Sequence, residues 1–246
     1  MGHRLTKMQT TLKVQSSELG NLAGYGAKFC SPREAAEKFW KRNVGYEKFN
    51  EYTKIHGQPE WLRKEKFVYG NADAKQIMME AQRVKTENTG DIGGVLKSVS
   101  DDKRASAFTA EQKQFLEEAT RTKVFQQHGT RKEGSTLDQW CRENGKNAVK
   151  PTDKYTLRIH EQVVIVGLID GRTEDDELLE FKNRAGGRLF NEIRSYEMAQ
   201  CQAYLRMLGF ERGYLIECLR REGQEPKLNT LPFSRDDEFW EDTVER

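Results

Sequence analysis

The sequence predicts an α+β fold, in which a small mixed β-sheet is flanked by helices and preceded by a mainly helical N-terminal lobe. Residues 163–169 form an apolar, β-branched run that is typical of a buried strand. A second short strand follows an acidic turn at residues 178–182, and helical patterns lie on both sides of the pair. We expect the helical lobe at residues 1–106 and the core at residues 107–246, which ends in a short acidic helix.

The bulk composition predicts an intracellular protein without a membrane partner. The 246 residues suffice for one substantial core with an appended lobe. Charged residues make up 33% of the chain, and no apolar run approaches the ~20 residues that a membrane span needs. The four cysteines are far apart and form no CxxC pair, so we expect reduced thiols in the cytoplasm or nucleus. The net charge of +2 does not indicate a partner by itself.

The N-terminal lobe contains one helix with strong start signals. Ser31 is a natural N-cap, Pro32 suits the first helical position, and Glu34 completes a capping box. Residues 46–70 interleave aromatic side chains with lysine and arginine, a pattern that can bind nucleic acid but is more typical of a helical core with a solvated face. Clustered glycines and charges predict a mobile loop around residues 87–105.

Two consecutive helices are expected at the start of the core. Thr109 is the natural N-cap of the first, with Gln112 at the capping-box position. In the second helix a glutamate shares one face with three apolar residues, at Glu133, Leu137, Trp140 and Cys141. A carboxylate on an apolar stripe is costly unless a charged group faces it. Glu133 is therefore either a site residue or a side chain at the edge of the stripe that reaches water.

The predicted strand pair brings three ionisable side chains together. Residues 163–169 end on Asp170, and alternation in the second strand places Glu180 and Lys182 on one face with Phe181 on the other. If the two strands pair as a hairpin, Asp170 lies beside Glu180. Two carboxylates and a backbone carbonyl suit Mg²⁺ or Mn²⁺, and a lysine can orient the attacking water or stabilise the transition state. The alternative is a surface hairpin whose charges are solvated.

A helix at about residues 191–208 is expected after the strand pair, with Gln200 and Tyr204 one turn apart. A glutamine on an apolar stripe is either a hydrogen-bonded core residue or a group that supports the site. Residues 211–221 predict a further strand, after which the chain loops past two prolines to the acidic C-terminal helix.

Asp170, nine intervening residues and then Glu180-Phe181-Lys182 resemble the core motif of the PD-(D/E)XK nuclease superfamily. The closest likeness is to its phage lambda exonuclease / YqaJ-like viral recombinase branch, which implies a restriction-endonuclease-like core. Ile169 stands where the superfamily name has proline, a residue that ligates nothing. The cysteines do not form the C-terminal cluster of the iron–sulfur nucleases, so we expect no iron–sulfur cluster.

The resemblance implies a role for each candidate site residue. Mg²⁺ or Mn²⁺ would be held at four positions, namely Glu133, Asp170, Glu180 and the backbone carbonyl of Phe181. Lys182 would position or activate the attacking water, with Gln200 and Tyr204 as its supporting shell. Four residues would contact DNA. Ser17 matches a serine that receives the DNA 5′-phosphate, with Lys28 as a neighbouring cation, although Ser-Ser-Glu before a helix is also an ordinary cap. Arg184 and Arg188 follow the catalytic strand and are candidates for phosphate contact.

The function implied by the resemblance is metal-dependent DNA hydrolysis by a 5′→3′ exonuclease that acts on the ends of double-stranded DNA. Its setting would be recombination or replication, as a viral protein in the host cell, with a homo-oligomer and a single-strand annealing protein as partners. Two alternatives stay open. One is an endonuclease of the same superfamily, a junction resolvase or nicking enzyme, and the other is a DNA-binding module without catalysis. A covalently closed circular substrate separates an exonuclease from an endonuclease.

Overall fold

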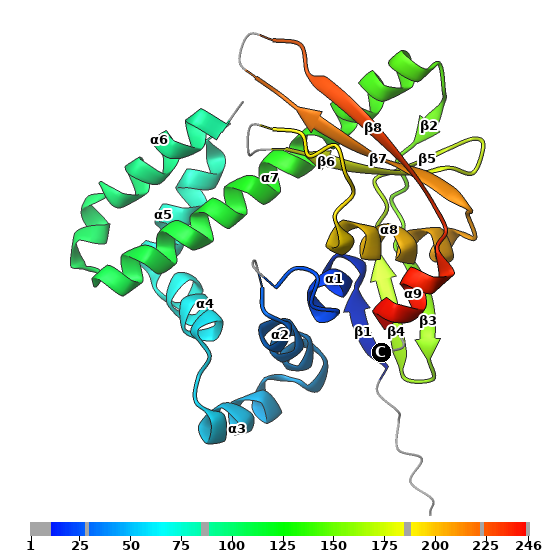
Figure 1. Cartoon of the computed structure of the whole chain (residues 1–246). Coiled ribbons are helices and arrows are strands. Elements are labelled where there is room, and N and C mark those ends of the chain that lie inside the picture. The colour runs from blue at the N-terminus through cyan, green and yellow to red at the C-terminus, as the bar shows by residue number, and fades with distance from the viewer. Residues whose placement is uncertain (1–10, 28–29, 85–88, 185–187, 222–223, 245–246) are drawn as a thin grey trace, which may run out of the picture.

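The chain folds into two small β-sheets with helices around them and a bundle of helices at one side, in the computed structural model shown in Figure 1. The structure describes residues 11–27, 30–84, 89–184, 188–221 and 224–244, with the side chains of 89–91 and 128–131 left out. The predicted α+β class is confirmed, because small mixed sheets and flanking helices make up the core.

The first sheet has three strands in the order β1-β4-β3, which are β1 (Leu12–Gln15), β3 (Tyr155–His160) and β4 (Val163–Gly167). Strand β4 is central, parallel to β1 and antiparallel to β3. Ile165, in the middle of β4, is completely buried. The N-terminal strand β1 therefore belongs to the core, although it lies far before residue 107 in the sequence.

The second sheet has five strands in the order β2-β5-β6-β7-β8. Their bounds are β2 (Ala148–Val149), β5 (Gly171–Thr173), β6 (Leu178–Asn183), β7 (Arg212–Leu219) and β8 (Lys227–Ser234). The predicted hairpin between residues 163–169 and 178–182 is wrong. Strand β6 pairs with β5 across the acidic turn and with β7 on its other side, because β1 and β3 occupy both edges of β4.

Strand β8 was not predicted, since two prolines suggested a loop. It is the outer strand of the five-stranded sheet and pairs antiparallel with β7, with Pro232 opposite Tyr214. Proline lacks a backbone N–H, so a sheet accepts it at an edge where no neighbour needs that donor.

Helix α8 (Ser195–Leu208) packs against both sheets, as Figure 1 shows. Its Cys201 and Leu205 join a buried cluster with residues of the five-stranded sheet, while Ala199 and Ala203 join a cluster with Ile165. The short α1 (Leu19–Leu22) and the C-terminal α9 (Asp237–Val244) lie beside α8. Helix α8 therefore packs against both sheets and fixes the positions of its own side chains between them.

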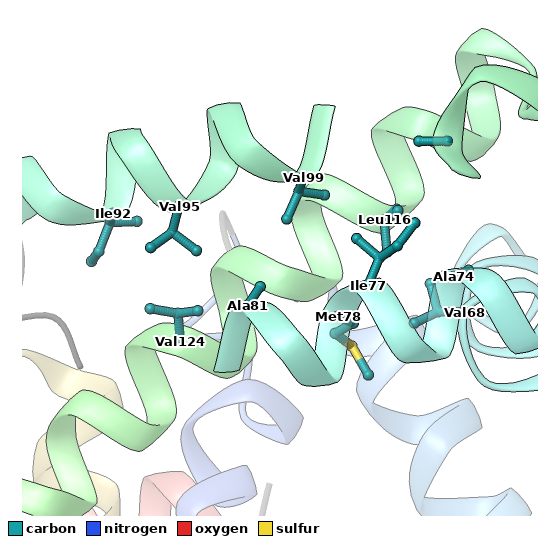
Figure 2. Packing of buried hydrophobic residues seen from close by; sticks show 11 residues of the cluster. Val68, Ala74, Ile77, Met78, Ala81, Ile92, Val95, Val99, Leu116 and Val124 are labelled. Carbon is teal, nitrogen blue, oxygen red and sulfur yellow. The ribbon is translucent and has the colours of Figure 1, made fainter. Parts of the chain in front are cut away.

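The remaining helices form the helical lobe, namely α2 (Pro32–Val44), α3 (Tyr46–His56), α4 (Glu60–Gly70), α5 (Ala72–Arg83) and α6 (Thr89–Ser100). The predicted N-cap of α2 is confirmed, because the Ser31 hydroxyl accepts a hydrogen bond from Glu34 N at 3.2 Å. Figure 2 shows the main core of the lobe, where α4, α5, α6 and the first part of α7 contribute buried aliphatic side chains.

Helix α6 replaces most of the mobile loop that was predicted around residues 87–105. Its Ile92, Val95 and Val99 recur at helical spacing and are 2–5% exposed against α5 and α7. A glycine in a helix costs only about 1 kcal/mol relative to alanine, so the burial of this stripe outweighs the glycines that suggested a loop. A 3₁₀ turn at Lys103–Ala107 follows.

Helix α7 (Ala110–Asn144) is one continuous helix where two were predicted. Its predicted start is confirmed, with Thr109 as N-cap and Gln112 completing the capping box. Its first part packs in the helical lobe through Leu116, and its last part packs Trp140 against the five-stranded sheet. The predicted division at residue 106 stays a prediction, and the packing of α7 and β1 crosses it.

None of the helices that the structure describes combines the length and the apolar character that a membrane crossing requires. All four cysteines are unpaired thiols.

Candidate active site

Asp170 lies in the bend between β4 and β5, beside the middle of β6. Its Oδ2 accepts a hydrogen bond of 2.9 Å from the backbone N–H of Phe181. This bond brings the carboxylate next to the strand that carries Glu180 and Lys182. The structure thus places Asp170 where the sequence predicted it, but through β5–β6 pairing instead of a β4–β6 hairpin.

Glu180 and Lys182 lie on the same face of β6, as the alternation of side chains along a strand predicts. Lys182 Nζ donates to Glu180 Oε1 at 2.6 Å and to Gln200 Oε1 at 3.1 Å. The side chain of Glu180 is 3% exposed and that of Lys182 is 22% exposed, so the ion pair is shielded from water on most sides. Phe181 points the other way, into an apolar cluster with Trp140.

The three charges shift each other's pKa values. Burial, followed by the negative charge of Glu180, holds the pKa of Asp170 well above its ordinary value, while Lys182 opposes the shift. Burial also raises the pKa of Glu180 against the pull of Lys182. Burial alone would lower the pKa of Lys182, but the carboxylates of Glu180 and Asp170 outweigh it and raise that pKa. Two carboxylates therefore share one ammonium, and a further positive charge here would stabilise both ionised forms.

The donor atoms fit a hard divalent cation. Glu180 Oε2 is buried and has no hydrogen-bond partner among the described residues, so this oxygen is available as a ligand. Carboxylate oxygens are the ligands that Mg²⁺ prefers. Whether the Phe181 carbonyl joins them stays a prediction.

Glu133 on α7 is near this cluster but turned toward another partner. Its charge contributes to the raised pKa values of Asp170 and Glu180. Its Oε2, however, forms an ion pair of 2.5 Å with Lys150. Within the part of the chain that the structure describes, no three His, Cys, Asp or Glu side chains are arranged as a complete metal centre. Glu133 as a ligand therefore stays a prediction that requires it to leave Lys150.

Gln200 and Tyr204 connect the site to the end of the N-terminal strand. Gln200 Nε2 donates to the Tyr204 hydroxyl at 3.1 Å, and that hydroxyl donates to the Leu168 carbonyl at 2.9 Å. Ser16 Oγ donates to the same hydroxyl at 2.9 Å. Burial, with the nearby charge of Glu180, raises the pKa of Tyr204 to about 12, so the phenol stays protonated. A chain of hydrogen bonds thus runs from Ser16 to Lys182.

Two residues of this arrangement were missed from the sequence. Ser16 is 3% exposed and donates a hydrogen bond to Tyr204, whereas its neighbour Ser17 was the predicted site residue. Gly167 ends β4 where a Cβ atom would lie 2.3 Å from Tyr204 Cε1 and 2.7 Å from Ser16 Oγ. Only glycine leaves room for that contact. The position of Gly167 directly after the apolar run of residues 163–166 was the sequence signal that could have indicated this close contact.

The predicted DNA contacts lie in different surroundings. Ser17 is exposed in a 3₁₀ turn and can meet a ligand, while Lys28 lies outside the described residues. Arg188 is exposed and stacks over the Phe190 ring at 5.1 Å, at the rim of a hollow that also contains Arg221 and Lys227. Ser17 and Arg188 stay candidates for phosphate contact.

Arg184 is mostly buried and is engaged by two carboxylates. Its side chain is 8% exposed and pairs with Glu197 and Glu217, each at 2.7 Å. Glu217 also accepts hydrogen bonds from the backbone of Phe190 and Asn191. The guanidinium therefore links β6, β7 and α8, and its donors bind carboxylates instead of the predicted DNA phosphate.

Comparisons with protein-family models and with curated protein sequences find no match. The chain is similar in structure to an alkaline exonuclease, LHK-Exo, from Laribacter hongkongensis, with 15% identity and a TM-score of 0.39 over 57% of this chain and 81% of that one. A structure of LHK-Exo in complex with dAMP gives 14% identity and the same TM-score of 0.39 over 60% of this chain and 80% of that one.

A phage related exonuclease from Haemophilus somnus 129PT is similar at 15% identity and a TM-score of 0.39, over 65% of this chain and 89% of that one. These proteins are exonucleases. Similarity at this level does not transfer an activity to this chain.

Proposed function

We propose that the chain is a metal-dependent nuclease that hydrolyses DNA phosphodiester bonds, with Asp170, Glu180 and Lys182 as its catalytic residues. The observation that carries the proposal is their convergence: Asp170 is bonded to the backbone of β6 between Glu180 and Lys182, and these two are ion-paired. Burying two carboxylates beside a single ammonium is energetically unfavourable. Such clusters of ionisable groups with shifted pKa values are typical of functional sites.

Mg²⁺ or Mn²⁺ would be held by Asp170 and Glu180, with the Phe181 carbonyl and Glu133 as further ligands. When bound, such an ion supplies a Lewis acid that lowers the pKa of an attacking water and offsets charge on the leaving oxygen.

The protein's own groups orient the reactants. Lys182 is held protonated by its carboxylate neighbours, so it acts as a hydrogen-bond donor that aligns the water or stabilises the negative charge of the transition state. Gln200 accepts a second hydrogen bond from Lys182, and Tyr204 accepts one from Gln200. This rigid support is what a preorganised electrostatic site needs, because the donors do not have to reorient during the reaction.

The substrate we propose is the end of double-stranded DNA, degraded from the 5′ end in recombination or replication. Ser17, exposed beside the buried Ser16, would receive the 5′-phosphate, and Arg188 would contact the backbone. The resemblance in the sequence further implies that the protein forms a homo-oligomer and acts with a single-strand annealing protein.

The test is cleavage of an end-labelled duplex in Mg²⁺ by the wild type, by Lys182→Ala and by the control Lys154→Ala, which removes an exposed lysine of the same core. We expect Lys182→Ala to lose about 10²–10³ in rate, the usual effect of one preorganised group, with little change in DNA affinity. Lys154→Ala should cleave normally, and a covalently closed circle should remain intact. A folded Lys182→Ala protein that cleaves at the wild-type rate would contradict the proposal.

A further inference from the structure

A hollow in the helical lobe, lined by both apolar and polar side chains, has no role in the site described above. It has a volume of about 570 Å³ and lies between α4, α5 and α7. Its lining includes Tyr69, Lys75, Lys123, Gln126 and Gln127. Its floor includes Met78, which also belongs to the lobe's core in Figure 2, so the hollow is built on a packed base. Its volume lies within the usual range of about 300–1,000 Å³ for ligand sites.

The hollow carries uncompensated positive charge. Lys75 and Lys123 line it, and no carboxylate is found among the described residues of the lining. An adjoining hollow shares Tyr69, Lys123 and Gln126 with this one and also contains three glutamates. These glutamates already pair with other lysines, namely Glu34 with Lys38, Glu65 with Lys41 and Glu118 with Lys64. No ion pair of Lys75 or Lys123 occurs within the ranges that the structure covers. Two ammonium groups without partners at one hollow attract an anion.

The same hollow exposes an aromatic ring and amide groups. Tyr69 is 47% exposed, although it belongs to a helix whose other face is buried. Gln126 is exposed on α7, and the amide oxygen of Gln127 is buried with no hydrogen-bond partner in the described part of the chain. A partner that donates to this oxygen would remove an unsatisfied polar group. The exposed ring can stack on a nucleotide base, the ammonium groups can bind its phosphate, and the amides can form hydrogen bonds with the edge of the base.

Helix α7 connects the hollow with the candidate active site. Gln126 precedes Glu133 by seven residues, which is almost two helical turns, so both lie on one stripe about 10 Å apart along the axis. Figure 1 shows α7 running from the helical lobe to the five-stranded sheet. A DNA strand that passes the active site can therefore reach the hollow along the surface of one helix.

We propose that this hollow binds single-stranded DNA next to the active site, with a base stacked on Tyr69 and phosphates held by Lys75 and Lys123. The inference rests on the proposed nuclease function and adds a second contact for the strand. Stacking on an aromatic ring and contact with phosphates are both independent of base sequence, so the site would accept any sequence. A neutral or cationic partner would leave the two lysines uncompensated.

The experiment measures binding of a fluorescent oligo-dT by anisotropy in EDTA, over a series of salt concentrations. EDTA prevents metal-dependent cleavage, so binding is measured alone. The double variant Lys75→Ala/Lys123→Ala is compared with Lys48→Ala/Lys54→Ala, which removes two exposed lysines from α3. Each phosphate contact contributes about 0.7 to the slope of log affinity against log salt for single strands. We expect the magnitude of this slope to decrease by about 1.4 in the Lys75→Ala/Lys123→Ala variant, because two phosphate contacts are lost, and to stay unchanged in the control.

The aromatic contact is tested by Tyr69→Leu, with Tyr46→Leu as its control because Tyr46 is 55% exposed on another helix. Tyr69→Leu should weaken binding about tenfold without changing the salt slope, as expected for one lost stacking contact. Tyr46→Leu should bind like the wild type.

Equal effects in the test and control variants, or no effect in either, would overturn this inference. If Mg²⁺-dependent cleavage still requires Lys182, the proposed function stands in that case. A wild-type chain that neither binds nor cleaves DNA overturns the proposed function together with the inference.

Discussion

Replacing Tyr204 with phenylalanine removes one hydroxyl on which three hydrogen bonds converge. Ser16 and Gln200 donate to it, at 2.9 and 3.1 Å, and it donates to the Leu168 carbonyl at 2.9 Å. Tyr204 is 3% exposed, so water cannot readily replace the lost oxygen. The ring itself stays in its apolar cluster, which makes Tyr204→Phe a test of the hydroxyl alone.

The magnitude follows from the three bonds. Each contributes about 1 kcal/mol to the free energy of unfolding, so we expect a loss of about 3 kcal/mol. The catalytic effect arises because Gln200 loses the group that holds its amide toward Lys182. Removal of a supporting residue around a metal site typically costs about 10–100-fold in activity, and we expect a loss of this size.

The assay combines urea unfolding with single-turnover cleavage of an end-labelled duplex. Tyr155→Phe is the matched control, because Tyr155 packs against the same cluster and its hydroxyl has no hydrogen-bond partner within the described ranges. If Gln200 acts through the same chain, Gln200→Ala should slow the Tyr204→Phe protein by less than it slows the wild type. The reasoning is refuted if Tyr204→Phe matches Tyr155→Phe in both stability and rate.

Two further predictions concern DNA ends and pH. Ser17→Ala should slow cleavage of 5′-phosphorylated duplexes more than of 5′-hydroxyl duplexes; equal slowing of both would leave Ser17 as a simple turn residue. Although burial opposes it, hydrogen bonding to Arg184 and Arg194 lowers the pKa of Glu197 to about 2. The ionised Glu197 carboxylate, bound to these arginines, therefore stabilises the fold above the ordinary glutamate pKa, and this stabilisation is lost as the pH falls toward 2. Glu197→Gln should lower the free energy of unfolding by about 3 kcal/mol at pH 7. That deficit in urea unfolding should shrink between pH 5 and pH 2, and a deficit that is constant with pH would contradict the assignment.

Local signals in the sequence predicted local structure well. The caps at Ser31 and Thr109 are confirmed because an N-cap depends on residues within one turn. The shared face of Glu180 and Lys182 follows from the alternation of a strand and is seen in their ion pair. Such features need no knowledge of distant parts of the chain.

Strand pairing could not be read from local patterns. Strand β4 pairs with β1, about 150 positions earlier in the chain, and nothing in the run of residues 163–169 identifies that partner. Asp170 still reached Glu180, because the turn after β4 leads directly into β5, which pairs with β6. The sequence thus predicted that Asp170 lies beside the strand of Glu180 and Lys182, although it predicted the wrong strand pairing.

Tertiary packing also overrode local propensity. Glycines in α6 suggested a loop, but Ile92 and Val95 bury a stripe that holds the helix. Helix α7 continues through Gly134 because both of its ends pack against separate cores. The buried pairing of Arg184 was equally hidden, since its partner Glu217 lies on another strand.

The central claim is that Asp170 and Glu180 hold a divalent metal that DNA cleavage requires. The most direct measurement titrates Mg²⁺ into single-turnover reactions of the wild type and of Asp170→Asn, which keeps the shape of the side chain and removes its charge. We predict no cleavage by either protein in EDTA, Mg²⁺-dependent cleavage by the wild type, and none by a folded Asp170→Asn protein at the same Mg²⁺ concentrations. Full activity in EDTA, or wild-type cleavage by Asp170→Asn, would contradict the account.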